Sequence, residues 1–177
     1  MSESPRSKPA GLLERARREV LVNDGAMGTM LQAAGLPGGA CPEEWNVTQP
    51  EKVRAVHAAY FAAGSDMVQT NSFGGSRPKL ALYGYQDRAR EFNRCAVELA
   101  REVAPPGGIV AFVVGPSGKM LAPLGDASYD LLVEVFTEQI VAALEGGPDA
   151  IFIETMSDPA EARAGIEAAK TSCPLPV

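Results

Sequence analysis

The chain has 177 residues, of which 46% are hydrophobic, and its formal net charge at pH 7 is −6. A chain of this size can bury one compact core, so we expect one domain or part of one. Nucleic-acid and anionic membrane surfaces need clustered Lys and Arg, and the excess of acidic residues argues against both. We therefore expect small molecules or proteins as partners.

No apolar run approaches the about 20 residues that a membrane-spanning helix needs, and the polar residues 1–9 lack the apolar centre of a signal peptide. These features predict a cytoplasmic protein in which residues 1–9 form a flexible tail ahead of one domain, residues 10–177. Cys41, Cys95 and Cys173 share no CxxC or Cys/His spacing, which favours reduced thiols over a disulfide framework.

Strands and helices alternate along the predicted chain. Short apolar runs between turns predict strands, and apolar residues repeated every three or four positions predict helices. The predicted elements are a short helix over Gly11–Glu19, a strand over Glu19–Val22, a helix over Gly28–Ala34, a helix from a Thr48/Glu51 capping box to Gly64, a strand over Met67–Gln69, a helix over Asp87–Val103, a strand over Ile109–Val114, a helix over Tyr129–Leu144, a strand over Ala150–Ile153 and a helix from Asp158 to about Lys170.

A weak internal repeat accompanies this order. Gly64-Ser65-Asp66 precedes one predicted strand and Gly147-Pro148-Asp149 precedes another. About four strand–helix units in series require parallel strands with right-handed crossovers. The pattern therefore predicts an α/β fold that is either a doubly wound sheet or a (β/α)₈ barrel.

The stretch Val22–Thr29 reads Val-Asn-Asp-Gly-Ala-Met-Gly-Thr and lies where an apolar run gives way to a helix. Gly25 lets the backbone turn tightly and approach a bound molecule, and the amides of Ala26 and Met27 suit a carboxylate. Asp24 suits an amine. These features predict an amino acid as ligand, although a turn that only ends a strand has nearly the same sequence.

Polar side chains follow several of the predicted strands. Asp24, Thr70, Ser72 and Glu154 lie at or just beyond the carboxyl ends of separate strands, which converge on one face in either architecture. Two carboxylates there can hold an ammonium group while Thr70 and Ser72 supply hydrogen bonds. The alternative is that Asp24 and Glu154 only bond to loop backbones. A glycosidase-like carboxylate pair is a much weaker alternative.

Four motifs resemble a known family when they are taken together and in order. They are Asp24-Gly25-Ala26-Met27-Gly28-Thr29-Met30, Gln69-Thr70-Asn71-Ser72-Phe73-Gly74-Gly75, Val114-Gly115-Pro116 and Ile153-Glu154-Thr155-Met156-Ser157-Asp158. Their order and spacing are similar to those of the homocysteine S-methyltransferase domain, which occurs in cobalamin-dependent methionine synthase and in betaine-homocysteine methyltransferases. The resemblance runs from about Leu12 to the last residue of the sequence.

The resemblance implies that residues 10–177 are the amino-terminal part of a homocysteine-binding (β/α)₈ barrel and cover about the first four units, a half barrel. It implies that Asp24 and Glu154 bind the substrate amino group, that the amides near Ala26 and Met27, next to Gly25, bind its carboxylate, and that Thr70 lines the same pocket. In this family zinc binds the homocysteine thiol and presents it as a thiolate to a methyl donor.

The family's zinc ligands are cysteines in an Asn-Cys motif and a Gly-Gly-Cys-Cys motif, and this sequence contains neither motif. We therefore expect no catalytic residue and no metal ligand in this chain. Cys41 lies in the loop after the first strand but has no partner thiol nearby, and His57 is expected to be a surface or packing residue on the outside of the fold.

The sequence therefore predicts the amino-acid-positioning half of a homocysteine S-methyltransferase, in which a methyl group passes to homocysteine to give methionine. Homocysteine and a methyl donor or corrinoid module are the expected partners, and zinc is the expected metal of the whole domain. The alternative is a noncatalytic half barrel that binds an amino acid or assembles with a separate carboxyl-terminal half. Open sheet edges would also favour self-association.

Overall fold

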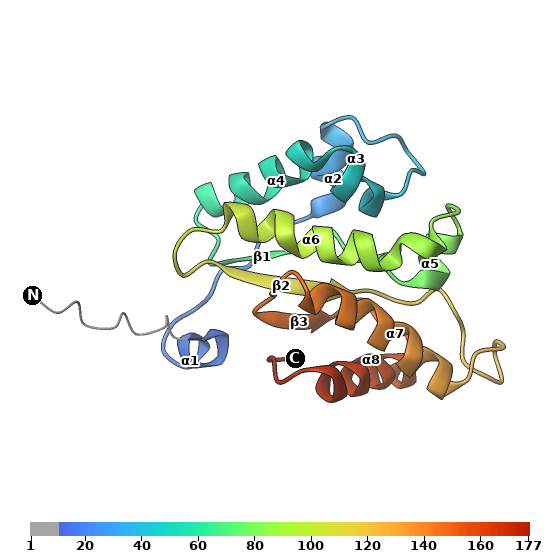
Figure 1. Ribbon diagram of the computed structural model, residues 1–177. Helices are drawn as coiled ribbons and strands as arrows, with labels where there is room; N and C mark the ends of the chain where they lie inside the picture. Colours follow the sequence, from blue (N-terminus) through green and yellow to red (C-terminus); the bar gives the residue numbers. More distant parts are fainter. Residues whose placement is uncertain (1–10) are drawn as a thin grey trace, which may run out of the picture.

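Residues 11–177 are described by the structure, a computed structural model of the chain (Figure 1). The predicted tail, residues 1–9, lies outside the described residues. Among the described helices, none is both long enough and apolar enough to cross a bilayer.

A parallel sheet of three strands forms the centre of the fold. The strands are β1 (Met67–Gln69), β2 (Ile109–Val114) and β3 (Ala150–Ile153), in the order β1-β2-β3. Val68 pairs with Val110, and Phe112 pairs with Ile151. All three strands have the bounds that the sequence predicts. The parallel α/β class that the alternating pattern predicts is confirmed for this part of the chain.

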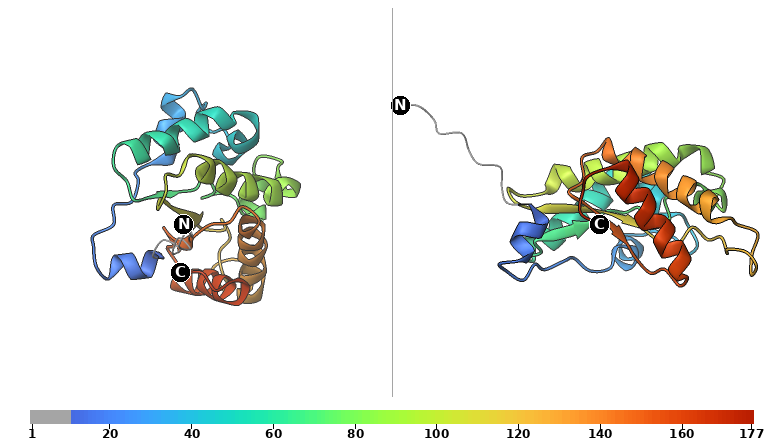
Figure 2. Two further views of the ribbon diagram at one scale, coloured as in Figure 1. Left: turned by 60° about the vertical axis from the view of Figure 1, so that its left-hand side comes forward. Right: turned by 90° about the horizontal axis from the view of Figure 1, so that it is seen from below.

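Helices join the strands and cover the sheet. The longer ones are α4 (Pro50–Ala62), α6 (Ala89–Val103), α7 (Tyr129–Leu144) and α8 (Pro159–Ser172). They contact one another in sequence, α4 with α6, α6 with α7 and α7 with α8, and follow one another along the sheet in Figure 2. The shorter elements are α1 (Leu12–Ala16), α2 (Met27–Ala33), α3 (Trp45–Thr48), α5 (Arg77–Ala81) and two 3₁₀ turns, η1 (Pro42–Glu44) and η2 (Gln86–Arg88).

The prediction of a strand over Glu19–Val22 is wrong. The segment runs beside β1 but makes a single parallel bridge, between Asn23 and Met67. The Val22 carbonyl accepts from two successive amides, those of Asp66 and Met67, and the Val22 amide donates to the Asp66 carboxylate at 2.9 Å. A side chain thus takes the place of a backbone acceptor, so no regular ladder forms.

The capping box predicted at Thr48 is also wrong. Helix α4 begins at Pro50 with Gln49 as its N-cap residue, and Gln49 makes no side-chain capping bond. The Thr48 hydroxyl donates instead to the Glu44 carbonyl at 3.2 Å, one turn earlier, at the start of the short helix α3. The predicted acidic cap of α8 is confirmed, because Asp158 accepts from the amide of Ala160.

The internal repeat has a structural reason. Asp66, just before β1, accepts from the Val22 amide and pairs with Arg15 at 2.7 Å. Asp149, just before β3, accepts from the Val110 amide at 2.8 Å and pairs with an arginine, Arg101, at 2.7 Å. Each aspartate therefore ties the start of its strand to the neighbouring segment, which sets the register of the parallel pairs.

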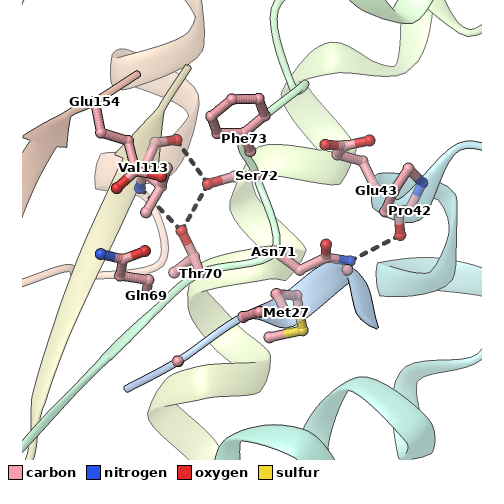
Figure 3. Close-up of a pocket in the computed structure, with 13 residues that line it drawn as sticks. Met27, Pro42, Glu43, Gln69, Thr70, Asn71, Ser72, Phe73, Val113 and Glu154 are labelled. Atoms are coloured by element: carbon pink, nitrogen blue, oxygen red, sulfur yellow. Dashed lines mark hydrogen bonds between the residues drawn. The ribbon is translucent and has the colours of Figure 1, made fainter. Parts of the chain in front are cut away.

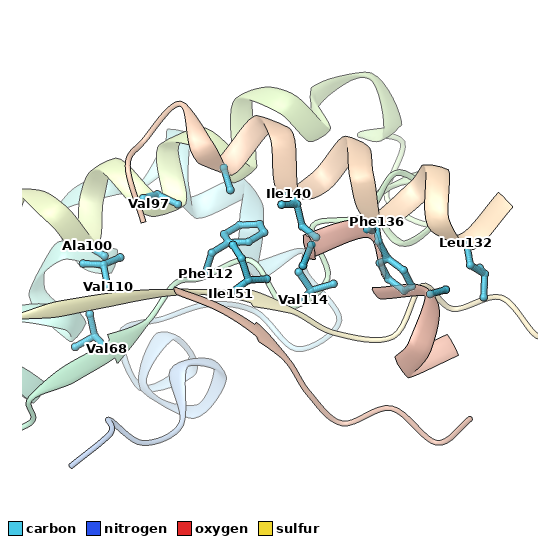
Figure 4. Close-up of a cluster of buried hydrophobic side chains, with 14 of the residues drawn as sticks. Val68, Val97, Ala100, Val110, Phe112, Val114, Leu132, Phe136, Ile140 and Ile151 are labelled. Atoms are coloured by element: carbon cyan, nitrogen blue, oxygen red, sulfur yellow. The ribbon is translucent and has the colours of Figure 1, made fainter. Parts of the chain in front are cut away.

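The main core lies between the sheet and helices α6, α7 and α8 (Figure 4). Val110, Phe112 and Val114 alternate along β2, and their side chains pack against helix residues such as Phe136 and Ile140. Every residue of β2 is buried, as expected for a parallel strand that is covered on both faces.

His57 is fully buried on α4, which confirms it as a packing residue and contradicts a place on the surface. Neither ring nitrogen has a hydrogen-bond partner among the described residues. Burial lowers the pKa of His57 to about 4, so the ring is neutral at pH 7 and fills space in the core.

The packing predicts a large effect for Phe112, which is 0% exposed in the central strand. Phe112→Ala should lower the free energy of unfolding by about 3–5 kcal/mol, because the sheet and helices cannot close the cavity completely. Denaturant unfolding measures the change. Val141→Ala is the control, since Val141 is 47% exposed on α7; equal losses for both variants would contradict this account of the core.

Candidate substrate site

A cavity of about 280 Å³ lies where the strands end (Figure 3). It is bounded by the turn before α2, by η1, by the loop between β1 and α5, and by the ends of β2 and β3. The lining residues are Gly25, Ala26, Met27, Gly28, Pro42, Glu43, Gln69, Thr70, Asn71, Ser72, Phe73, Val113 and Glu154. The structure thus brings together Gly25, Ala26, Met27, Thr70, Ser72 and Glu154 of the predicted site residues.

Thr70 and Ser72 form a closed ring of hydrogen bonds with Val113 of β2. The Ser72 hydroxyl donates to the Val113 carbonyl at 2.8 Å, so the Thr70 hydroxyl, 2.6 Å away, donates to Ser72. Thr70 in turn accepts from the Val113 amide at 3.2 Å. Both hydroxyl protons are therefore used within the protein, and toward a ligand these groups can only accept hydrogen bonds.

Asp24 does not line the cavity but lies directly behind it. Its Oδ2 accepts from the amide of Gln69, a lining residue, at 3.0 Å. Its Oδ1 is buried with no hydrogen-bond partner among the described residues. Burial raises the pKa of Asp24 to about 6, and the nearby charge of Glu154 adds to the rise. Oδ1 of the carboxylate therefore lacks a cation or donor that would satisfy it.

Glu154 follows β3 and provides the second carboxylate. It is partly buried, and burial raises its pKa, while a hydrogen bond with the Gln69 side chain works in the opposite direction. The next residue, Thr155, has φ +60°, a left-handed conformation that is unfavourable for a β-branched residue. Such strain is concentrated at functional sites, which supports Glu154 as a functional residue.

The turn before α2 is held in place from behind by Tyr60 of α4. The Tyr60 hydroxyl donates to the Ala26 carbonyl at 3.0 Å. A Cβ atom on Gly25 would lie 2.9 Å from that hydroxyl oxygen, so a side chain there would displace the Tyr60 ring from this contact. Ala26 is the N-cap residue of α2 and Met27 is its first residue. Backbone N–H groups at these positions have no acceptor within the helix.

The structure adds lining residues that sequence reasoning did not select, above all Glu43 and Asn71. The Asn71 side chain donates to the Pro42 carbonyl at 2.7 Å and to the Asn46 side chain at 2.9 Å, so it joins two walls of the cavity. Glu43 accepts from the Gly74 amide at 2.6 Å. The unusual length of the loop over residues 35–46 is the only sequence signal for these contacts.

A parallel sheet with a cavity at the carboxyl ends of its strands defines the class of protein, a parallel α/β protein with a candidate ligand site at that edge of the sheet. The family model described as homocysteine S-methyltransferase matches residues 21–177. The chain is 37% identical to methionine synthase of Mycobacterium tuberculosis and 36% identical to that of Mycobacterium leprae, with 88% of the chain covered. The chain belongs to the homocysteine S-methyltransferase family.

The solved structures that the chain resembles include the homocysteine methyltransferase MmuM from Escherichia coli. The metallated form has a TM-score of 0.76 and 26% identity over 88% of this chain, and the apo form has a TM-score of 0.68 over 93% of this chain. The chain spans 61% of the metallated MmuM chain and 14% of either methionine synthase.

The described residues do not fit a metal site. Within residues 11–177, no group of three or more His, Cys, Asp or Glu side chains is placed to hold a metal ion. Cys41 is buried, and its thiol donates to Glu43 at 3.3 Å. Burial, with the charge of Glu43, raises the pKa of Cys41 to about 12, so it stays a protonated thiol and not a thiolate ligand.

The raised pKa of Asp24 predicts a pH-dependent stability. Its ordinary value is 3.8 and its value in the folded chain is about 6, so the folded chain binds this proton more tightly than the unfolded chain does. The contribution of Asp24 to the free energy of unfolding therefore falls as pH rises through this range. The side chain that Asp24→Asn introduces does not titrate. The free energy of unfolding of the variant, relative to that of the parent chain, should therefore increase as pH rises from 3.8 to about 6. Urea unfolding of both chains at each pH measures this difference.

Comparison of the two chains at each pH removes the opposite contribution of His57, whose pKa is lowered. A difference between the two chains that stays constant with pH would contradict the burial of the Asp24 carboxyl.

Proposed function

We propose that this chain forms the amino-acid-positioning part of a homocysteine S-methyltransferase domain, within a (β/α)₈ barrel of which residues 10–177 are the amino-terminal part. The observation that carries the proposal is one cavity of about 280 Å³ that is lined by the Glu154 carboxyl and by Ala26 and Met27 at the start of α2. The Asp24 carboxyl lies just behind this lining, bonded to the amide of Gln69. An α-amino acid offers an ammonium group and a carboxylate to match them. The family, and the names of its relatives, support homocysteine as the substrate.

The ammonium group is assigned to Asp24 and Glu154. Both carboxyl groups have raised pKa values because burial is not offset by a cation. An ammonium placed between them would neutralise their repulsion and give the unpartnered Oδ1 of Asp24 a donor. Burial now disfavours the charged forms of both carboxyl groups. A bound ammonium would remove that penalty, and this would favour binding of an amine.

The carboxylate is assigned to the amides of Ala26 and Met27, next to Gly25. These residues line the same cavity as Glu154, and Tyr60 fixes the turn through the Ala26 carbonyl. Backbone N–H groups that point into a cavity stabilise an anion without the desolvation cost of a buried lysine or arginine. Thr70 and Ser72 would then accept hydrogen bonds from the substrate.

The described residues position a substrate and do not activate it. We assign no catalytic and no metal-binding role to them, because they provide no ligand set for the zinc that the family resemblance implies. Methyl transfer to a zinc-bound homocysteine thiolate, from a corrinoid or another donor, is therefore proposed for the whole domain, and no step of it is assigned to these side chains.

One observation favours the second role, assembly with a further part of the barrel. The Ile151 amide of β3 donates to the Pro176 carbonyl at 2.9 Å. The carbonyl of a parallel strand paired with β3 would accept the same kind of hydrogen bond. Beside β3 lies a cavity of about 390 Å³, lined mainly by Ile151, Phe152, Ile153 and Val177. A further strand from the same or a separate chain would cover this apolar edge. Self-association through it is the other outcome.

Homocysteine binding tests the proposed function directly. By calorimetry, Asp24→Asn and Glu154→Gln should each weaken binding of homocysteine by about tenfold or more, since each removes a charge-assisted hydrogen bond to the ammonium. Asp126→Asn is the matched control, because Asp126 is exposed in the loop before α7 and changes net charge equally. Equal affinities in all variants would contradict the assignment.

A further inference from the structure

The loop between β1 and α5, residues 70–76, makes one wall of the cavity through Thr70, Asn71, Ser72 and Phe73. Its backbone is bonded by side chains from three distant elements. The Gln139 amide group on α7 donates to the Ser72 carbonyl at 2.9 Å. The same carbonyl also accepts from the Gly75 amide at 2.9 Å, which closes a tight turn.

Two further side chains hold the second half of the loop. Asn93 of α6 donates to the Gly75 carbonyl at 2.8 Å, and Glu43 of η1 accepts from the Gly74 amide at 2.6 Å. The three side chains come from three different elements, α7, α6 and η1. We call Glu43, Asn93 and Gln139 the loop clamp.

The polarity of the loop clamp is unfavourable for core packing alone. Gln139 and Asn93 are each 1% exposed, and Glu43 is 4% exposed. The side-chain carbonyl oxygens of Gln139 and Asn93 have no partner among the described residues, which is a cost that an apolar side chain on α6 or α7 would avoid. The hydrogen bonds that the two side-chain NH₂ groups donate to the loop carbonyls offset this cost.

The loop fits the clamp without spare room. A Cβ atom on Gly75 would lie 2.2 Å from Oδ1 of Asn93, and one on Gly74 would lie 2.9 Å from Oε1 of Glu43. Arg77, which opens α5 just after the loop, pairs with Glu138 beside Gln139 on α7. A larger residue at either glycine would therefore displace a side chain that holds the loop.

We propose that Gln139, with Asn93 and Glu43, is a positioning residue of the substrate site: it holds the Ser72 turn so that Thr70 and Ser72 face the amino acid. This inference rests on the proposed function of the cavity. The clamp residue Gln139 acts from a helix through the loop backbone and does not line the cavity itself.

The test uses the full chain with Gln139→Met and Asn93→Leu, which keep the bulk of the side chain and remove both the donor and the unpartnered acceptor. Gln86→Met is the matched control, because Gln86 lies on η2 outside the clamp. Three quantities are measured: the hydrogen-exchange rate of the Gly75 amide by NMR, the thermal midpoint, and the Kd for homocysteine.

Both clamp variants should exchange the Gly75 amide about tenfold faster and bind homocysteine about tenfold more weakly, with the thermal midpoint nearly unchanged. The control should match the parent chain. An unchanged Gly75 exchange rate in both variants would overturn the clamp, and faster exchange with unchanged affinity would overturn its positioning role. A parent chain that binds no homocysteine would refute the proposed function instead, while the exchange rates still decide whether the clamp exists.

Discussion

Parallel pairing of β1, β2 and β3 is the constraint on which the site depends, since it puts the carboxyl ends of all three strands at one edge. The pairing is fixed at the opposite end by Asp66 and Asp149, each bonded to a neighbouring backbone amide and to an arginine. With the register set there, the loops after the strands must meet, and the cavity forms where they do. The structural anchors and the candidate substrate site thus lie at opposite ends of one sheet.

The cavity end contains groups that are unfavourable for the chain alone. Asp24 and Glu154 are carboxyl groups with raised pKa values, one of them with an unpartnered buried oxygen, and Thr155 has a strained backbone. Unpartnered buried atoms also occur elsewhere in the described fold, on His57, Asn93 and Gln139. Among the described residues, however, carboxyl groups with raised pKa values and a strained non-glycine backbone occur together at the cavity end. Such a concentration of local cost at one place is typical of a binding site, where a ligand supplies the missing partner.

Local sequence signals predicted the elements whose pattern depends on their own residues. The apolar run of β2 and the amphipathic repeat of α7 both have the predicted bounds. The strand expected at Glu19–Val22 failed because a side chain, Asp66, competes for its backbone groups. The contacts of Gln139 and Asn93 with the loop could not be predicted from the sequence. Both are single polar residues on helices, and the backbone carbonyls to which they donate belong to a loop that is distant in the sequence.

The central claim is that Asp24 and Glu154 hold the ammonium group of an amino acid. The most direct measurement is the pKa of Asp24 by NMR titration with and without saturating homocysteine. Without ligand the value should be about 6, and with ligand it should fall toward the ordinary range, because a nearby ammonium stabilises the carboxylate. A pKa of Asp24 that is the same in the free and the homocysteine-bound chain would contradict the account.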